Sequence, residues 1–93
     1  MAGKALVAAL EDTDKVVRRQ AAWALGKIGD SRAVPALVSK NMDPDLDVRW
    51  FARWALQQIT HQNFGKDQDS WRRWWSEHGV DSAWGNPEEL LAY

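Results

Sequence analysis

Apolar residues recur every three or four positions in two stretches of the chain, a spacing that predicts amphipathic helices. At about 100° per residue, each stretch places its apolar residues in one stripe: Val17, Ala21, Ala24, Leu25 and Ile28 in the first, and Val48, Ala52, Ala55, Leu56 and Ile59 in the second. We predict helices from about Lys15 to Ile28 and from about Leu46 to Thr60, with both stripes in the core. A larger side chain at Ala24 or Ala55 is expected to overpack that core by about 1–3 kcal/mol.

A shorter helix is predicted before each of these, from about Lys4 to Leu10 and from about Ala33 to Met42. Pro35 is compatible with the first turn of a helix, where its missing N–H has no partner in any case. Asp14 and Asp45 directly precede the longer helices, where a carboxylate accepts from free backbone N–H groups. Gly29 directly follows the first of these longer helices, and glycine commonly ends a helix because it adopts the left-handed conformation easily. The chain thus reads as two helical hairpins.

The two hairpins are copies of one sequence unit. Residues 2–29 align with residues 33–60 at an offset of 31, and 13 of the 28 aligned positions are identical. The shared motifs are AxxALV, DxDxxVR and AxWALxxI. A fixed period of this length is typical of repeat proteins, in which each unit buries its apolar face against its neighbours.

The segments DKVVRRQAAWALGKIGDSRAVPALV and DLDVRWFARWALQQIT resemble HEAT repeats of the short, phycobilisome-lyase-like type. The resemblance covers about residues 2–60 and implies an all-α fold, a right-handed α-solenoid of two HEAT-like hairpins. It also implies that Arg18 and Arg49 bridge adjacent turns, as an arginine fork can. Three residues depart from the repeat pattern, and we expect them to alter local packing only: Asn41, Gln57 and His61.

The offset fails after Thr60, and a different segment begins. Asn63 and Gly65 are turn residues around the apolar Phe64, and a helix is expected over about 67–78. On this helix, one face carries the indoles together with His78, and the opposite face carries the charged residues. The indoles are those of Trp71, Trp74 and Trp75, and the charged residues are Asp69, Arg72, Arg73 and Glu77. ITHQNFGKDQDSWRRWW also looks like the closing segment of some bacterial HEAT-repeat proteins. We interpret it as a cap over the second repeat, in preference to a ligand site.

The predicted organisation is a single domain over residues 1–79, with repeat one at about 2–30 and repeat two at about 31–60, followed by a tail at 80–93. The sequence leaves open whether the tail, with Trp84 and Pro87, packs on the domain or meets a partner. The first helix has no unit before it, so Val7 and Leu10 are expected to be partly uncovered. Both a homodimer through this end and a missing N-terminal portion of a longer protein are consistent with that.

Composition restricts the possible partners. Twelve Lys and Arg nearly balance thirteen Asp and Glu, for a net charge of -1, so no overall field attracts nucleic acid or an anionic membrane. The chain has no cysteine, which excludes disulfides and thiol chemistry and fits a cytoplasmic protein. The residues after the opening apolar run are polar and lack a cleavage-type segment, so we do not interpret the run as a signal peptide.

Catalytic and metal-binding patterns are missing from the sequence. Its two histidines, His61 and His78, stand at a loop and at a helix end without a paired nucleophile, and each is interpreted as a surface or capping residue. No HxxxH, CxxC or glycine-rich phosphate motif occurs. We therefore expect no enzyme, no metal and no cofactor.

The remaining candidate surface lies on the longer helices, at positions that line the concave face in the repeats this chain resembles. Exposed aromatic residues beside Arg, Lys and Gln are typical of protein interfaces. The candidate partner-binding residues are Arg19, Gln20, Trp23, Lys27, Trp50, Phe51, Trp54 and Gln58, with Trp23 and Trp54 expected to stack. The alternative is that Trp50, Phe51 and Trp54 are covered by the cap or the tail.

The sequence thus favours a non-catalytic module that binds a protein on this face. The phycobilisome-lyase-like resemblance also allows a lyase or chaperone subunit that handles a linear tetrapyrrole, although fold alone does not establish function. A third possibility is an assembly role through self-association at the N-terminal end. The identity of the partner cannot be read from the sequence.

Overall fold

The computed structural model describes residues 2–78, and all its regular structure in that range is helical. The α-helices are α1 (Ala2–Ala9), α2 (Lys15–Ile28), α3 (Val34–Lys40), α4 (Leu46–Thr60) and α5 (Gln68–His78), and the 3-10 turn η1 (Ser31–Ala33) leads into α3. The expected all-α fold is confirmed. The expectations for Gly79 and Val80 as a helix stop, and for the tail at 80–93, lie outside the described residues.

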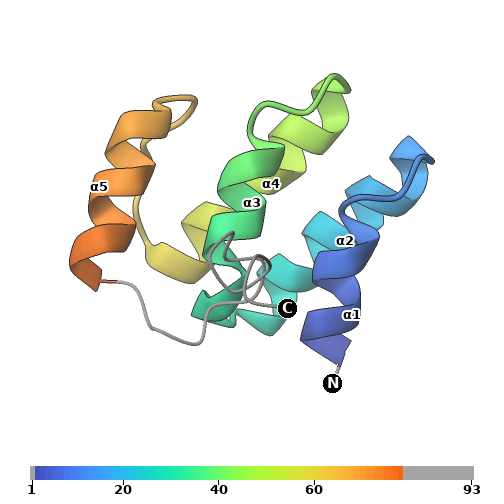
Figure 1. The fold of residues 1–93 in the computed structure, drawn as a ribbon, viewed down its shortest axis with the longest axis horizontal. Coiled ribbons are helices and arrows are strands. Elements are labelled where there is room, and N and C mark those ends of the chain that lie inside the picture. The colour runs from blue at the N-terminus through green and yellow to red at the C-terminus, as the bar shows by residue number, and fades with distance from the viewer. Residues whose placement is uncertain (1, 79–93) are drawn as a thin grey trace, which may run out of the picture.

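The helices are arranged as a row of units (Figure 1). The hairpin of α1 and α2 lies beside the hairpin of α3 and α4, and α5 stands at the far end of the row, next to α3. The longer helices α2 and α4 pack against each other, while α1 and α3 each pack on the longer helix of their own hairpin. This is an α-solenoid of two repeats and a terminal helix.

The helix ends follow the sequence closely. Asp14 accepts a hydrogen bond from the backbone N–H of Val16 at 2.8 Å, and Asp45 accepts one from Val48 at 3.0 Å, so both carboxylates cap the longer helices as predicted. Gly29 ends α2 in the left-handed conformation, with φ of 75°. The shorter helices differ slightly from the prediction, because η1 takes the first turn expected of α3, and α1 already ends at Ala9.

The core lies between the two layers of helices and includes most of the predicted stripes. Ala21, Leu25, Val48, Ala52, Ala55 and Leu56 are buried in it. Four expectations were wrong, the first being Val17, which is only partly buried and lines an open pocket. Ile28 is 48% exposed, Leu10 is fully buried, and Ala24 is only partly buried beside an open pocket, so the overpacking argument applies to Ala55 alone.

A glycine sets the distance between α2 and α4. A Cβ at Gly26 would lie 2.6 Å from Cζ3 of Trp54 and 3.0 Å from the backbone Cα of Ala55. Neither atom can retreat easily, because one belongs to a rigid ring and the other to a helix backbone. The corresponding residue in α4 is Gln57, which is exposed, since no further longer helix covers that side of α4 among the described residues. The departure at Gln57 thus marks the end of the repeat stack.

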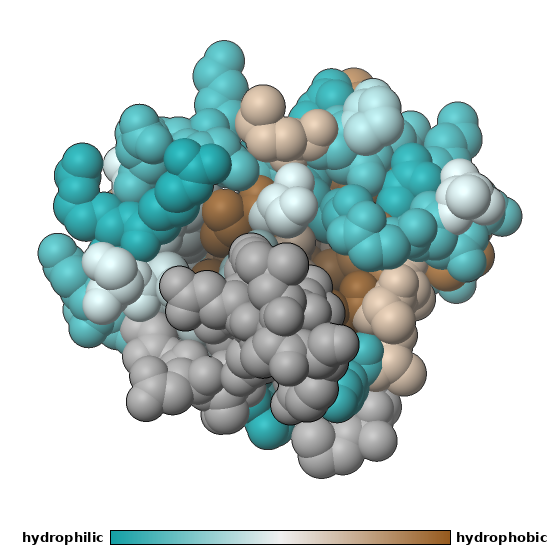
Figure 2. All heavy atoms as spheres, viewed as in Figure 1, coloured by the Kyte–Doolittle hydropathy of each residue, from teal (hydrophilic) through white to brown (hydrophobic). Residues whose placement is uncertain are grey.

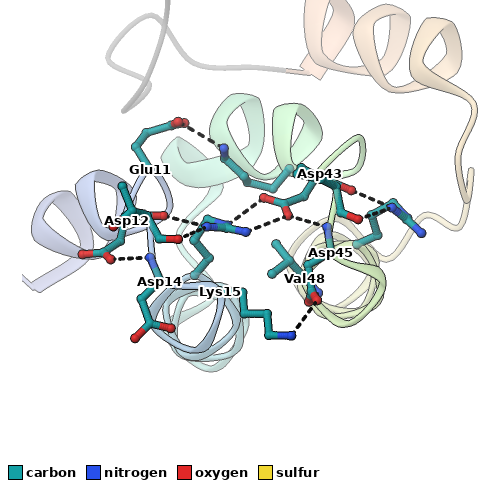
Figure 3. Close-up of polar contacts among 12 residues, drawn as sticks. Glu11, Asp12, Asp14, Lys15, Asp43, Asp45 and Val48 are labelled. Carbon is teal, nitrogen blue, oxygen red and sulfur yellow. Dashed lines mark hydrogen bonds and ion pairs between the residues drawn. The ribbon is translucent and has the colours of Figure 1, made fainter.

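An arginine ladder joins the two turns on one edge of the stack (Figure 3). Arg18 donates from Nε and Nη2 to the carboxylate of Asp43, at 3.0 and 3.3 Å, and from Nη1 to the backbone carbonyls of Asp12 and Thr13. Arg49 likewise donates from Nη1 to two backbone carbonyls, those of Asp43 and Pro44. The expected bridge between adjacent turns is confirmed for Arg18, which links the first repeat to the second, whereas these hydrogen bonds of Arg49 stay within its own turn.

The third departure from the repeat pattern, Asn41, attaches the cap. Its side chain is fully buried, and its Nδ2 donates to the carbonyl of Gly65 at 2.7 Å and to Oε1 of Gln68 at 2.8 Å. Its Oδ1 accepts from Nε of Arg53. In the first repeat, the apolar Leu10 stands at the position of Asn41, and the apolar Ala22 stands at the position of Arg53. The second repeat therefore has a polar pair where the first has an apolar pair.

The indole face of α5 turns inward as the helical angles predicted. Trp71 is buried against Phe64 in an edge-to-face contact, with ring centroids 4.8 Å apart, and its Nε1 donates to the carbonyl of Gly65. Trp75 also packs on the core, whereas Trp74 stacks on His78 at 4.9 Å. The charged face is exposed, and an ion pair on it joins Asp69 to Arg72. The cap interpretation agrees with this packing.

Two end residues of the helices also behave as the sequence suggested. His61 ends α4 with φ of 59°, the conformation for which glycine is usual. At the start of α5, the side chain and backbone N–H of Ser70 donate to Asp67, and these hydrogen bonds hold the pKa of that carboxyl below its ordinary value. Asp67 therefore caps α5 in its charged form.

We predict that Gly26→Ala destabilises the protein although alanine is the better helix former. The added Cβ would overlap Trp54 and the backbone of α4, at a cost of about 1–3 kcal/mol that exceeds the gain in helix propensity of about 1 kcal/mol. Urea denaturation measures the free energy of unfolding. Gln57→Ala, at the equivalent exposed position, is the control and should be neutral; equal effects of the two variants would contradict the close approach.

We predict that Asn41→Ala loosens the cap, because it leaves Arg53 and Gln68 without their buried partner, a loss of about 1–3 kcal/mol. Tryptophan emission should move to longer wavelength as Trp71 becomes accessible to water. Asn63→Ala removes the same side chain at an exposed turn and should change neither quantity. Unaltered emission and stability in Asn41→Ala would show that the cap is held by apolar contacts alone.

Candidate partner-binding face

The candidate face lies on the sides of α2 and α4 that the shorter helices leave open. Trp23 is 48% exposed, and the ammonium group of Lys27 lies 5.8 Å from the centroid of its ring, one turn along α2. Arg19, one turn before Trp23, donates to Asp47 of α4 at 3.0 Å. This ion pair crosses between the repeats and holds the guanidinium beside the indole.

A shallow pocket of about 260 Å³ runs between α2 and α4 at this point. It is lined by Val16, Arg19, Gln20, Trp23 and Phe51. Four of the eight predicted partner-binding residues therefore meet in one pocket, whose wall combines apolar surface, an aromatic ring and a guanidinium. These groups can bury an apolar side chain, and the guanidinium can donate a hydrogen bond to a neutral or negatively charged acceptor at the rim.

A second aromatic pair extends the face along α4. Trp50 is 59% exposed, and its ring meets that of Phe51 edge to face, with centroids 5.0 Å apart. The cap does not account for this surface, because α5 packs next to α3 and its indoles contact Phe64, His78 and the core. Trp50 is thus one of the largest exposed apolar side chains in residues 2–78.

The other two predicted residues are placed differently. Trp54 is half-buried, and its ring fills the space that Gly26 leaves on α2, so its main contact is structural. The expected stacking of Trp23 on Trp54 is wrong, because their ring planes form no aromatic contact in the described part of the chain. Gln58 is exposed on α4 and lies outside the pocket lining.

Val16 and Asp47 belong to the face but were not among the predicted binding residues. Val16 is 40% exposed, so it offers apolar surface where the helical pattern would place a polar residue. An exposed valine at a polar position was the available signal in the sequence. The role of Asp47 depends on Arg19 in the other repeat, and no local pattern indicates that pair.

Neither histidine forms part of a reactive group. His61 caps α4, and Nδ1 of His78 lies 3.1 Å from the carbonyl of Trp74 within α5. Within residues 2–78, no three His, Asp or Glu side chains gather as metal ligands. In the same range, no helix is both long and apolar enough to cross a membrane.

Stacked helical hairpins of about 31 residues, closed by a terminal helix, define the class of α-helical repeat proteins. The model of the HEAT repeats family matches residues 3–80. This chain therefore belongs to the HEAT-repeat family.

A curated relative adds a more particular likeness. Over 62 residues the chain is 44% identical to phycocyanobilin lyase subunit alpha of Nostoc sp. (strain PCC 7120 / SAG 25.82 / UTEX 2576). The match covers 59% of this chain and 22% of that protein, so the chain corresponds to about a fifth of the relative's length. No solved structure matches the chain.

Proposed function

We propose that this chain is a non-catalytic binding module that takes a protein partner on the face of α2 and α4. The single observation that carries the proposal is the pocket between Trp23, Arg19 and Phe51, beside the exposed Trp50. Large aromatic side chains and arginine are enriched among the residues that carry most of the binding energy of protein interfaces. A cytoplasmic location fits the absence of cysteine from the sequence.

The polar groups of the face suggest what the partner presents. Arg19 already pairs with Asp47, but that pair is exposed at its carboxylate end and can share its guanidinium with a second acceptor. The apolar floor at Val16 and Phe51 is suited to a side chain such as leucine or phenylalanine. A partner segment that carries an apolar anchor next to a carboxylate would complement both features.

We predict that Trp23→Ala combined with Arg19→Ala abolishes capture of partners by the tagged protein. Removal of two such side chains from an interface typically costs more than about 2 kcal/mol, or more than about thirtyfold in affinity. Quantitative pull-down from the native lysate measures the loss. Trp74→Ala with Arg72→Ala deletes the same two residue types from α5 and should retain every partner. Equal recovery by both double variants would contradict the proposal.

A tetrapyrrole-handling role is the second candidate, and the likeness to phycocyanobilin lyase subunit alpha is the observation that favours it. The aromatic face could stack a linear tetrapyrrole, and Trp23 would be the reporting side chain. In that case addition of phycocyanobilin should quench tryptophan emission and alter the visible absorbance of the pigment, and Trp23→Ala should weaken both effects. If neither spectrum changes on addition, this second candidate is excluded and the protein-binding proposal stands.

A further inference from the structure

The two longer helices present different chemistry to the candidate face. At the offset of 31, three cations of α2 correspond to three uncharged residues of α4. The cations are Lys15, Arg19 and Lys27, and their counterparts are Leu46, Trp50 and Gln58. All six are exposed except Arg19, which is partly buried in the wall of the pocket. The face therefore has a basic side on α2 and a largely apolar side on α4, with the pocket of about 260 Å³ between them.

The cations of α2 form one row along the helix. Lys15 and Arg19 are four positions apart, and Trp23 stands at the next position of the row, before Lys27. The row extends over about 18 Å at the rise of an α-helix. No Asp or Glu occurs within α2, so the row is not neutralised by its own helix. A segment that lies along α2 can therefore meet three positive charges and an indole in succession.

Arg19 has donors left for such a segment, unlike the arginine that precedes it in the sequence. Arg18 makes four hydrogen bonds, and its side chain is only 14% exposed. Within residues 2–78, Arg19 makes one, from Nη1 to Asp47, and its side chain is 30% exposed. A guanidinium group has five N–H donors. Arg18 is thus committed to the fold, whereas Arg19 can donate to a further acceptor.

Asp47 is the one acidic residue among the six basic residues of α2 and α4. Its side chain is 60% exposed, and a single oxygen contacts Arg19. An exposed ion pair with one contact contributes little to stability. A carboxylate of another molecule can therefore displace Asp47 from the guanidinium, and until then Asp47 occupies the place that this carboxylate would take.

The exposed arginines of α5 do not offer the same combination of groups. Hydrophilic residues cover α5, on the left of the molecule (Figure 2). There Arg72 pairs with Asp69 of the same helix. Arg19, in contrast, lines its pocket together with Trp23 and Phe51. Positive charge beside apolar surface thus distinguishes the face of α2 and α4 from the charged side of α5.

From these observations we propose that the partner of this face is an acidic protein segment, and that Asp47 competes with its carboxylates for Arg19. This assignment depends on the proposed function, because it concerns the same face, and it adds the charge of the partner and the residue that limits its affinity. The segment places an apolar side chain in the pocket and carboxylates along the basic row of α2. Asp47 selects against acidic segments without an apolar anchor, since these must displace it with no apolar contact in return.

Selection from a random library of displayed peptides of about twelve residues, the length of the basic row in a helix, tests the charge of the partner. With the full chain as bait, the enriched peptides should be net negative, carry a leucine or an aromatic residue, and fail to bind Trp50→Ala. Trp74→Ala on α5 is the matched control and should bind them normally. Neutral or basic peptides that still require Trp50 would overturn the acidic assignment and leave the proposed face intact. Acidic peptides that bind Trp50→Ala equally well would contradict the face itself.

The role of Asp47 is tested with a fluorescent synthetic copy of the most enriched peptide, whose Kd is measured by anisotropy. Asp47→Asn keeps the size of the side chain and removes its charge, so it should bind at least about threefold tighter, whereas Arg19→Gln should bind at least about fivefold weaker. Asp69→Asn removes a carboxylate from the other exposed Asp–Arg pair and should leave Kd unchanged. An equal gain in Asp69→Asn, or no gain in Asp47→Asn, would overturn the competition.

Three further measurements exclude other occupants of the face. A single-stranded oligo(dT) that binds as tightly as the peptide would assign the basic row to nucleic acid. Tighter peptide binding after deletion of residues 79–93 would assign the face to this chain's own tail, which carries Asp81, Glu88 and Glu89. Sedimentation of the unmodified chain as a dimer that the peptide dissociates would assign it to a second copy. Each of these results, and a selection that enriches no peptide at all, would overturn the proposal.

Discussion

The contact of Gly26 with Trp54 is the constraint on which the stacking of the two repeats depends. Two helices can approach this closely only where one of them lacks a side chain, and the partner ring then fills the space that the missing Cβ leaves. The approach also brings the two turns within reach of each other, so that Arg18 can span from the carbonyls of its own turn to Asp43. Steric fit and the arginine ladder therefore support the same register.

The two ends of the stack are built by opposite means. At the C-terminal end, polar residues replace an apolar pair, and Asn41 and Arg53 hold the loop before α5 through buried hydrogen bonds. Such bonds have strict geometry, and they fix the position of the cap more closely than apolar contact would. At the N-terminal end the first hairpin keeps the ordinary repeat pattern, and its flank is open. The two hairpins thus differ most where their sequences depart from each other, at Asn41 and Arg53.

Trp23 and Gln20 lie between two open pockets on the first hairpin. The indole of Trp23 borders the pocket between α2 and α4 and also a second pocket of about 430 Å³, which is lined by residues of α1 and α2. A substitution of Trp23 would therefore reshape both pockets.

The sequence alone determined the helices, the repeat, the caps and the inward face of α5, because each of these depends on residues close together in the chain. It also marked Asn41, Gln57 and His61 as departures, without their meaning. Tertiary structure decided what those departures do, and it placed Trp54 against Gly26 instead of on Trp23. The sequence predicted only part of the candidate face. Helical spacing shows on which side of a helix a residue lies, but the pocket between Trp23 and Phe51 forms only when α2 and α4 pack together.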